Sequence, residues 1–314
     1  MSLRLIYGRA GSGKSRFCLN DIKNRLDDGL DSPLVLVVPE QFSLQAERNL
    51  IKTAGAGGIL RAEVLSFRRM AFRVFSEVGG FARPHINTSG RCMLIFRIID
   101  ELKDDLRIFS RSANQRGFVN TLLETISEMK RYNVSPEMLE EVCKSAGEND
   151  LLRYKLQEIN HVYSEFEKRL HQKYMDPDDD LTQLALKLDS SRQFEGAEIW
   201  IDEFSGFTPQ EYSIIEKLLI KARRVNVCLC TDCLPENSDI DGTDLFLPTK
   251  STGLKLLKIA RENGVEIEDP VKLCRSNNTA LCPARFKNSE ELCHLEEHLF
   301  SFPYKVYPKE TSDI

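Results

Sequence analysis

The octet GRAGSGKS at residues 8–15 constrains the fold of this chain more than any other stretch of its sequence. It matches the pattern G-x-x-x-x-G-K-S, in which glycines let backbone N–H groups curl around a phosphate. The apolar stretch Leu3–Tyr7 before it is typical of a strand, and a helical pattern follows from Arg16. Because a helix N-terminus adds its dipole to such a loop, this context predicts a phosphate-binding loop in an α/β protein. The alternative is a glycine-rich turn that binds nothing.

The chemistry of this loop predicts a nucleotide and a metal ion. Lys14 is expected to reach the β- and γ-phosphates of ATP, and Ser15 to ligate Mg²⁺. The candidate nucleotide contacts are Gly8, Arg9, Ala10, Gly11, Ser12, Gly13, Lys14 and Ser15. The octet alone leaves open whether the phosphate is split or only held.

The order of apolar patterns divides the 314 residues into three regions. A continuous aliphatic run at 34–38 is typical of a buried parallel strand, and a further strand is expected at 59–66, so residues 1–86 are predicted to begin a P-loop, RecA-like α/β domain. Helical periodicity then dominates, which predicts an all-helical insertion over 87–194. Strand patterns return at 198–201 and 225–229, so we assign 195–314 to the resumed α/β domain and its tail.

A pair of acids follows the predicted strand at 198–201. Asp202 is a candidate Mg²⁺ ligand, and Glu203 is the neighbouring acid that could position a water, so both are candidate catalytic residues. An Asp-Glu pair after a strand is common by chance, but together with the P-loop it becomes more specific. The segment TPQE at 208–211 is a capping box with proline at the first helical position, which predicts a helix behind the acids.

Basic and aromatic residues interleave in LSFRRMAFRVF at 65–75. Residues 61–91 carry six arginines against two glutamates, a local net charge of +4 in a chain whose net charge is −5. Such a mixture is typical of single-stranded DNA binding, where bases stack on rings and phosphates pair with arginines. The alternative is an amphipathic helix on a solvated surface, with Met70, Val74 and Phe67 in the core.

Two other patterns could hold a metal ion but are explained better by ordinary structure. The CxxC segment at 230–233, with Cys228 nearby, lacks further ligands at matching spacing, so we expect ordinary buried or surface thiols. The acidic run at 176–180 could bind a cation, but turn and N-cap chemistry before the helix at Leu181 accounts for it.

The sequence also favours one cellular compartment. No apolar run approaches the length needed to cross a bilayer, and the N-terminus lacks the layout of a signal peptide. We therefore expect a cytoplasmic protein without a membrane partner.

These motifs together resemble a known family. VPEQ at 38–41, LSFRRMAFRVF at 65–75, MKRY at 129–132 and IWIDEFSGFTPQEY at 199–212 are similar to the N-terminal region of the B subunit of AddAB-type helicase–nucleases. These bacterial complexes process double-strand DNA ends for recombination. The segment at 202–212 also resembles motif II of superfamily 1 helicases, and that at 65–75 resembles their motif Ib.

The resemblance implies a partner, a substrate and further cofactors. It implies that this sequence is a fragment of a longer subunit, which pairs with an AddA-like helicase–nuclease and acts on double-stranded and single-stranded DNA. The family's nuclease domain and its iron–sulfur cluster would lie beyond residue 314, so none of the nine cysteines is assigned to that cluster. The B subunit of this family is regarded as a degenerate helicase that scans one strand for a Chi-type signal.

Four residues are the candidates for DNA contacts. Gln41, Phe67 and Arg69 flank predicted strands at the end where the P-loop opens, which is where the ligands of such sheets collect. Phe204 follows the two acids on the same edge.

Departures from superfamily 1 patterns weaken the case for a motor. The glutamine-bearing motif that precedes the P-loop has no room here, and CTDCLPENSD after 225–229 replaces the motif III pattern that couples ATP to DNA. We therefore expect ATP binding with weak or degenerate motor activity. The alternatives are an active superfamily 1 helicase or DNA-dependent ATPase, and a scaffold with a vestigial P-loop. Whether this region is itself an enzyme stays open.

Overall fold

The computed structural model describes residues 1–29, 32–55, 61–80, 83–112, 115, 117–145, 151–235, 240–273, 284–286, 288–300 and 302–307. The chain divides into two compact units. The first, here called the sheet unit, comprises Met1–Met70, Arg192–Phe207 and Ile215–Ile314, and the second, the helical unit, comprises Ala71–Ser191 and Thr208–Ile214.

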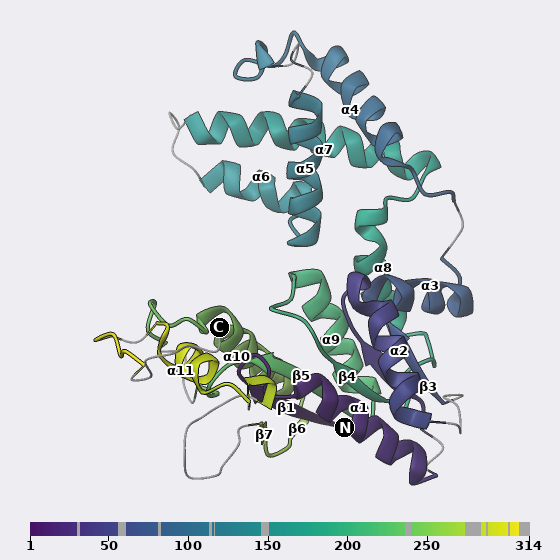
Figure 1. Cartoon of the computed structure of the whole chain (residues 1–314). Helices are drawn as coiled ribbons and strands as arrows, with labels where there is room; N and C mark the ends of the chain where they lie inside the picture. The colour runs from purple at the N-terminus through teal and green to yellow at the C-terminus, as the bar shows by residue number, and fades with distance from the viewer. Residues whose placement is uncertain are drawn as a thin grey trace. The chain divides into compact units, whose positions relative to one another are not determined.

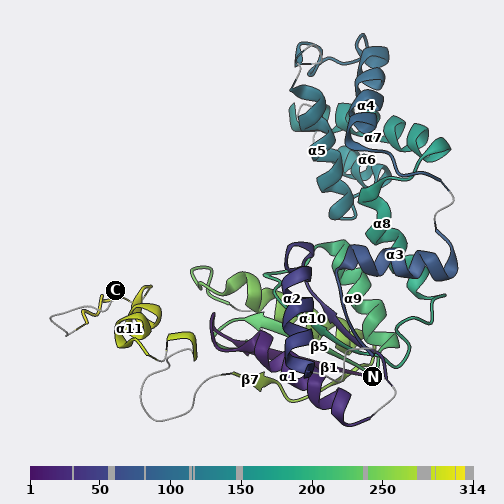
Figure 2. The same cartoon turned by 45° about the vertical axis from the view of Figure 1, so that its right-hand side comes forward.

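A parallel sheet of seven strands forms the centre of the sheet unit (Figures 1 and 2). Its strand order is β3-β2-β4-β5-β1-β6, and β7 also pairs with β1. The bounds are β1 Ser2–Gly8, β2 Leu34–Val37, β3 Ala62–Leu65, β4 Glu198–Ile201, β5 Arg224–Cys230, β6 Glu266–Ile267 and β7 Val271–Lys272. Because all the pairings are parallel, the carboxyl ends of β1 to β5 share one edge, to which the P-loop and the acids after β4 belong.

Helices pack against this sheet and bury its apolar side chains. They are α1 Lys14–Asp27, α2 Ser43–Ala54 and α10 Leu247–Glu262. The unit also contains the short 3₁₀ turns η1 Glu40–Phe42 and η5 Ala284–Phe286, and α11 Glu290–His298, which contacts η5. The unit boundaries fall within α3 Phe67–Val78 and α9 Pro209–Lys221. Trp200 in β4 is fully buried, and its indole Nε1 donates to Asp21 Oδ2 of α1 at 3.0 Å, so the ring both fills the core and satisfies its one polar atom.

The helical unit has its own core. Its helices are α4 Thr88–Leu102, α5 Phe118–Arg131, α6 Pro136–Ser145, α7 Leu151–Lys173 and α8 Asp180–Leu188, with the 3₁₀ turn η4 Pro177–Asp179 before α8. Side chains at helical spacing on α4, α5 and α7 meet in one cluster, in which Ile95, Ile126 and Phe166 are at most 1% exposed. This spacing is what makes each helix amphipathic.

A buried ammonium group ties α5 to α7 and to the turn before α8. The Nζ of Lys130 lies 2.6 Å from Glu167 Oε1, 2.8 Å from Asp176 Oδ2 and 2.9 Å from Asp179 Oδ1, and its side chain is 3% exposed. Arg91 of α4 adds a second cation, 3.1 Å from Asp176 Oδ1. Burial opposes the charged form of Lys130, but the three carboxylates raise its pKa above the usual value.

Asp179 makes the stability of this network depend on pH. Burial raises the pKa of this carboxyl from its usual 3.8 to about 6, against the effect of Lys130. The folded chain therefore binds the proton more tightly than the unfolded chain between about pH 4 and pH 6, so the contribution of Asp179 to the free energy of unfolding falls as the pH rises through this window. Against an Asp179→Asn variant, we expect the wild-type chain to lose roughly 1–3 kcal/mol from pH 4 to pH 7. Urea unfolding of both at each pH measures this difference, and parallel pH profiles would contradict the prediction.

Several sequence-based expectations are met. The α/β class with a parallel sheet is confirmed, with helices throughout 118–131 and 151–173. The capping box at α9 forms, since Thr208 N donates to Glu211 Oε2 at 2.7 Å and Glu211 N donates to Thr208 Oγ1 at 3.3 Å. Asp176 is the N-cap of η4, as expected of a turn, and it accepts from Asp178 N at 3.2 Å. Among the described residues, no helix has the length and apolarity that a membrane-spanning segment requires.

Candidate nucleotide-binding site

Three glycines shape the loop between β1 and α1. Gly11 and Gly13 have φ angles of 77° and 99°, in the left-handed region that favours glycine. At Gly8 the constraint is space, because a Cβ atom there would lie 2.5 Å from Ser12 Oγ and 2.6 Å from the carbonyl oxygen of Leu273. A residue with a side chain is therefore disfavoured at each of these three positions.

The loop encloses the ammonium group of Lys14. Its Nζ donates to the carbonyl oxygens of Gly8 at 2.7 Å and Arg9 at 3.0 Å, so the first residue of α1 reaches back over the loop. The hydroxyl oxygen of Ser12 is buried and has no hydrogen-bond partner among the described residues. A buried hydroxyl without a partner is costly, and a polar ligand group beside it would remove that cost.

The P-loop and the acid pair meet although they are 188 residues apart. Ser15 Oγ donates to Glu203 Oε1 at 2.8 Å. Glu203 has a φ angle of 67°, an uncommon conformation for a residue other than glycine, which turns the chain sharply after β4. Its neighbour Asp202 is 5% exposed, and the backbone N–H of Asp202 donates to the carbonyl oxygen of Val37 at 3.0 Å. The structure thus brings Ser15, Asp202 and Glu203 to one edge of the sheet.

Two thiols lie beside Asp202. Cys18 of α1 and Cys228 of β5 are 1% and 3% exposed, with their sulfur atoms 3.2 Å apart. One ligand atom of each thiol and of Asp202 lies within 4.8 Å of the others. The hydrogen bond with Cys18, burial and the charge of Asp202 all raise the pKa of Cys228.

The four candidate DNA contacts differ in accessibility. Gln41 is exposed in η1, after β2. Phe67, at the start of α3, is only 4% exposed, and its ring centroid lies 5.5 Å from that of Phe204, which in turn lies 5.2 Å from the ring of Phe207. The half-buried Phe204 is therefore the outer member of an aromatic cluster that Phe67 supports from within.

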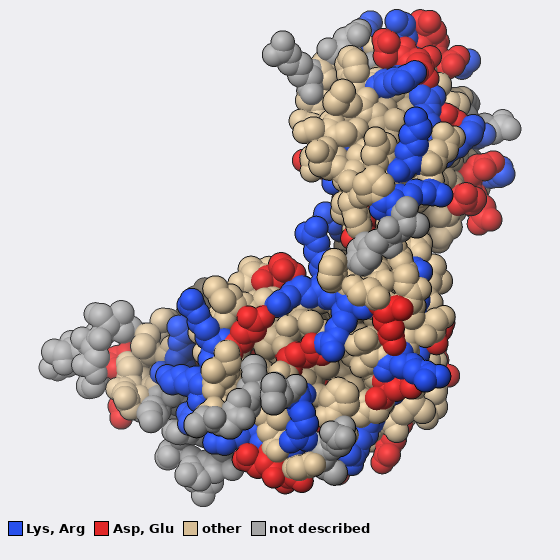
Figure 3. Space-filling model, turned by 90° about the vertical axis from the view of Figure 1, so that its right-hand side faces the viewer, with Lys and Arg blue, Asp and Glu red and all other residues tan. Residues whose placement is uncertain are grey.

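Arg69 is exposed but paired. Its Nη1 lies 2.6 Å from Glu47 Oε1 of α2, and the side chain is 46% exposed. Figure 3 shows that Lys and Arg on the face drawn there are interspersed with Asp and Glu. A phosphate contact by Arg69 would thus compete with its ion pair to Glu47.

Comparisons with known proteins assign the family. The family described as ADDB, N-terminal matches residues 5–296. The chain belongs to this family. It is 52% identical over its whole length to the B subunit of the ATP-dependent helicase/deoxyribonuclease of Clostridium botulinum strain Hall, and it covers 27% of that protein. The proteins of the same name from Acetivibrio thermocellus and Thermoanaerobacter sp. strain X514 are 52% and 48% identical over 314 residues, again with 27% of their length covered. The chain thus spans about a quarter of these ADDB relatives.

Some contacts of the site have no local signal in the sequence. Arg9 Nε lies 2.6 Å from Glu296 Oε1, and its guanidinium lies 5.8 Å from the ring centroid of Phe246. The backbone N–H of Arg285 donates to Gly11 O at 3.4 Å. Segments late in the chain therefore contact the P-loop, and neither spacing nor composition predicts which residues do so.

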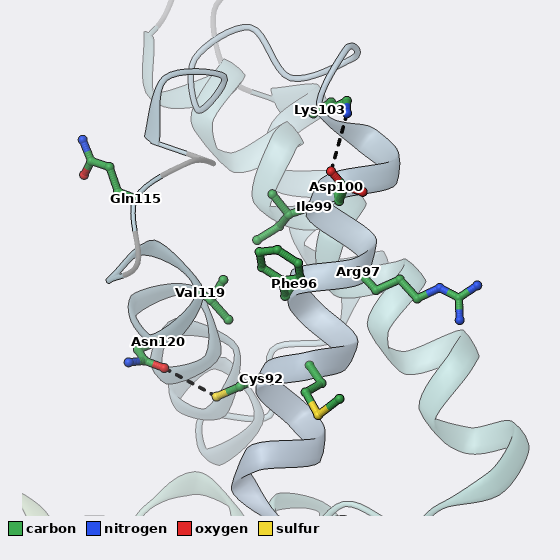
Figure 4. Close-up of a pocket in the computed structure, with 10 residues that line it drawn as sticks. Cys92, Phe96, Arg97, Ile99, Asp100, Lys103, Gln115, Val119 and Asn120 are labelled. Carbon is green, nitrogen blue, oxygen red and sulfur yellow. Dashed lines mark hydrogen bonds and ion pairs between the residues drawn. The ribbon is translucent and has the colours of Figure 1, made fainter.

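The helical unit carries a separate groove of about 760 Å³ between α4 and α5 (Figure 4). Met93 and Phe96 of α4 are 73% and 60% exposed on it. At its rim, Lys103 Nζ lies 3.5 Å from Asp100 Oδ1. Arg97, Gln115 and Asn120 also line the groove, so it combines an apolar surface with several polar side chains.

Proposed function

We propose that this chain is the nucleotide-binding, DNA-contacting N-terminal region of the B subunit of an AddAB-type helicase–nuclease. Such a protein would pair with an AddA-like partner in the cytoplasm and process double-strand DNA ends for recombinational repair. The proposal rests on the family and on one observation, the 2.8 Å hydrogen bond between Ser15 and Glu203 that joins the P-loop to the acids after β4.

The residues of the loop suit a nucleotide triphosphate with Mg²⁺. The partnerless hydroxyl of Ser12 would gain a hydrogen-bond partner from a phosphate oxygen bound in the loop. Lys14 would exchange its two carbonyl acceptors for phosphate oxygens, while Ser15 and Asp202 would hold the metal ion. A bound Mg²⁺ would neutralise phosphate charge, and Glu203 is the group that could accept a proton from a water beside it.

Hydrolysis by this region is proposed to be weak. In the described structure Glu203 engages Ser15, so its carboxylate must leave that hydroxyl before it can orient a water. A DNA-stimulated ATPase rate in this chain would instead favour an active superfamily 1 motor. Absence of any thermal shift with Mg-ATP would favour a scaffold with a vestigial P-loop.

The DNA-contacting part of the proposal places single-stranded DNA along the edge that carries Gln41, Arg69 and Phe204. An exposed amide, a guanidinium and a half-buried ring supply the hydrogen bond, phosphate contact and stacking surface that single strands need. Phe67 is proposed to act by supporting Phe204, because its own ring is buried.

The combined Gln41→Ala and Arg69→Ala change tests the DNA contacts. We expect about tenfold weaker binding of a single-stranded oligonucleotide at low salt, because one amide and one phosphate contact are lost. Fluorescence anisotropy measures the affinity, and Lys23→Ala, which removes an exposed charge on α1, is the matched control. Equal affinities of the double variant and the control would contradict this part of the proposal.

A further inference from the structure

We propose that Cys18, Cys228 and Asp202 form a site for a thiophilic divalent metal ion of the Zn²⁺ class. The three side chains come from α1, β5 and the end of β4, and each is at most 5% exposed. Two thiols with one carboxylate are a ligand set that zinc accepts, with a water as the fourth ligand.

The distances fit a tetrahedral ion after a small adjustment. The ligand atoms lie within 4.8 Å of one another, and the two sulfurs are 3.2 Å apart. With metal–sulfur bonds of about 2.3 Å, tetrahedral geometry separates two sulfurs by about 3.8 Å. The sulfurs therefore need to move apart by roughly half an ångström, which small side-chain rotations can supply.

The charge balance favours an exchange of protons for metal. Two thiols and one M²⁺ give two metal–sulfur bonds, and two protons leave to the solvent. Before the exchange the set carries the single negative charge of Asp202, and afterwards one M²⁺ with two thiolates and one carboxylate also carries one negative charge. Burial thus imposes no additional net charge on the core, which is the main cost of a buried ion.

The ligand chemistry separates this ion from Mg²⁺. Thiolates select zinc and similar soft or borderline ions, whereas Mg²⁺ takes oxygen ligands and keeps several waters. Under this proposal an ion would approach Asp202 from the side of Glu203, which follows it in the chain and is exposed.

Asp202 would belong to both sites, so a thiophilic ion should compete with Mg-ATP. This step rests on the proposed function, whereas the metal site itself does not. When Asp202 ligates the ion beside Cys18 and Cys228, its carboxylate is no longer available to the Mg²⁺ of the nucleotide. We therefore expect Zn²⁺ to weaken Mg-ATP binding by about tenfold or more.

The experiment titrates Co²⁺, a spectroscopic substitute for Zn²⁺, into the 314-residue chain and follows the absorption of cobalt–thiolate bonds. We expect one ion per chain for the wild type and at least about tenfold weaker binding in Cys18→Ser and Cys228→Ser. The double variant Cys230→Ser with Cys233→Ser is the matched control, because it removes the two cysteines of the CxxC segment at the end of β5 and just after it. Cys18→Ala and Cys228→Ala replace the serine variants if a hydroxyl in this core prevents folding.

Three outcomes are distinct. Loss of cobalt–thiolate absorption only in the Cys18 and Cys228 variants supports the site. Loss only in the Cys230–Cys233 control, or no thiolate absorption in the wild type, overturns it. Metal binding at Cys18 and Cys228 without any change in Mg-ATP affinity keeps the metal site and contradicts the assignment of Asp202 to the nucleotide.

Discussion

Replacement of Lys14 by alanine is expected to weaken Mg-ATP binding about 10- to 150-fold. The ammonium group is held inside the loop by the carbonyl oxygens of Gly8 and Arg9, where a phosphate would meet it. A hydrogen bond to a charged group contributes about 1.5–3 kcal/mol, which corresponds to this range of affinities. Isothermal titration calorimetry with Mg-ATP measures the change directly.

The control for this change removes the same charge from the same helix. Lys23 is exposed on α1, so Lys23→Ala should leave the affinity within about twofold of the wild-type value. The melting temperature without nucleotide should also stay unchanged in Lys14→Ala, because water can replace the ammonium group as the donor to the carbonyl oxygens of Gly8 and Arg9. If Lys14→Ala and Lys23→Ala had the same affinity for Mg-ATP, Lys14 and its loop would not bind the triphosphate.

Local patterns were sufficient to predict the elements that carry the site. The strand at 198–201 is buried throughout and is apolar after Glu198, and the hydrogen bonds of the capping box at 208–211 form at the start of α9. Both depend on neighbours in sequence, which is why spacing and residue type are enough to predict them. Parallel pairing then places the strand ends on one edge, so the convergence of Ser15 and Glu203 follows from topology.

Side-chain burial within an element was harder to predict. In α3, Phe67 and Met70 face inward, whereas Phe72 is 64% exposed between exposed arginines. The interleaved sequence is compatible with more than one helical phase, and only packing decides which aromatic ring is accessible. The meeting of Cys18 with Cys228, 210 residues apart, is likewise a property of tertiary structure.

The largest effect on stability is expected from Lys130→Met in the helical unit. This change leaves Glu167, Asp176 and Asp179 without the ammonium group that lies within 2.9 Å of each. Loss of one partner from a buried ionic network costs about 3–5 kcal/mol, because the remaining charges stay desolvated. The free energy of unfolding, measured in urea at pH 8, should fall by this amount.

Two comparisons separate the loss of this buried charge from the effect that any Lys→Met change has on the stability of the helical unit. Lys144 is 71% exposed beside Glu140, so Lys144→Met should cost less than about 0.5 kcal/mol. The loss in Lys130→Met should also be smaller at pH 5 than at pH 8, since protonation of Asp179, whose pKa is about 6, removes one of the three negative charges that faced the ammonium group. A loss that is independent of pH and no larger than that of Lys144→Met would mean that the carboxylates reach solvent when the ammonium is removed. In that case Lys130 would position the turn before α8, but it would not be needed to neutralise the carboxylates around it.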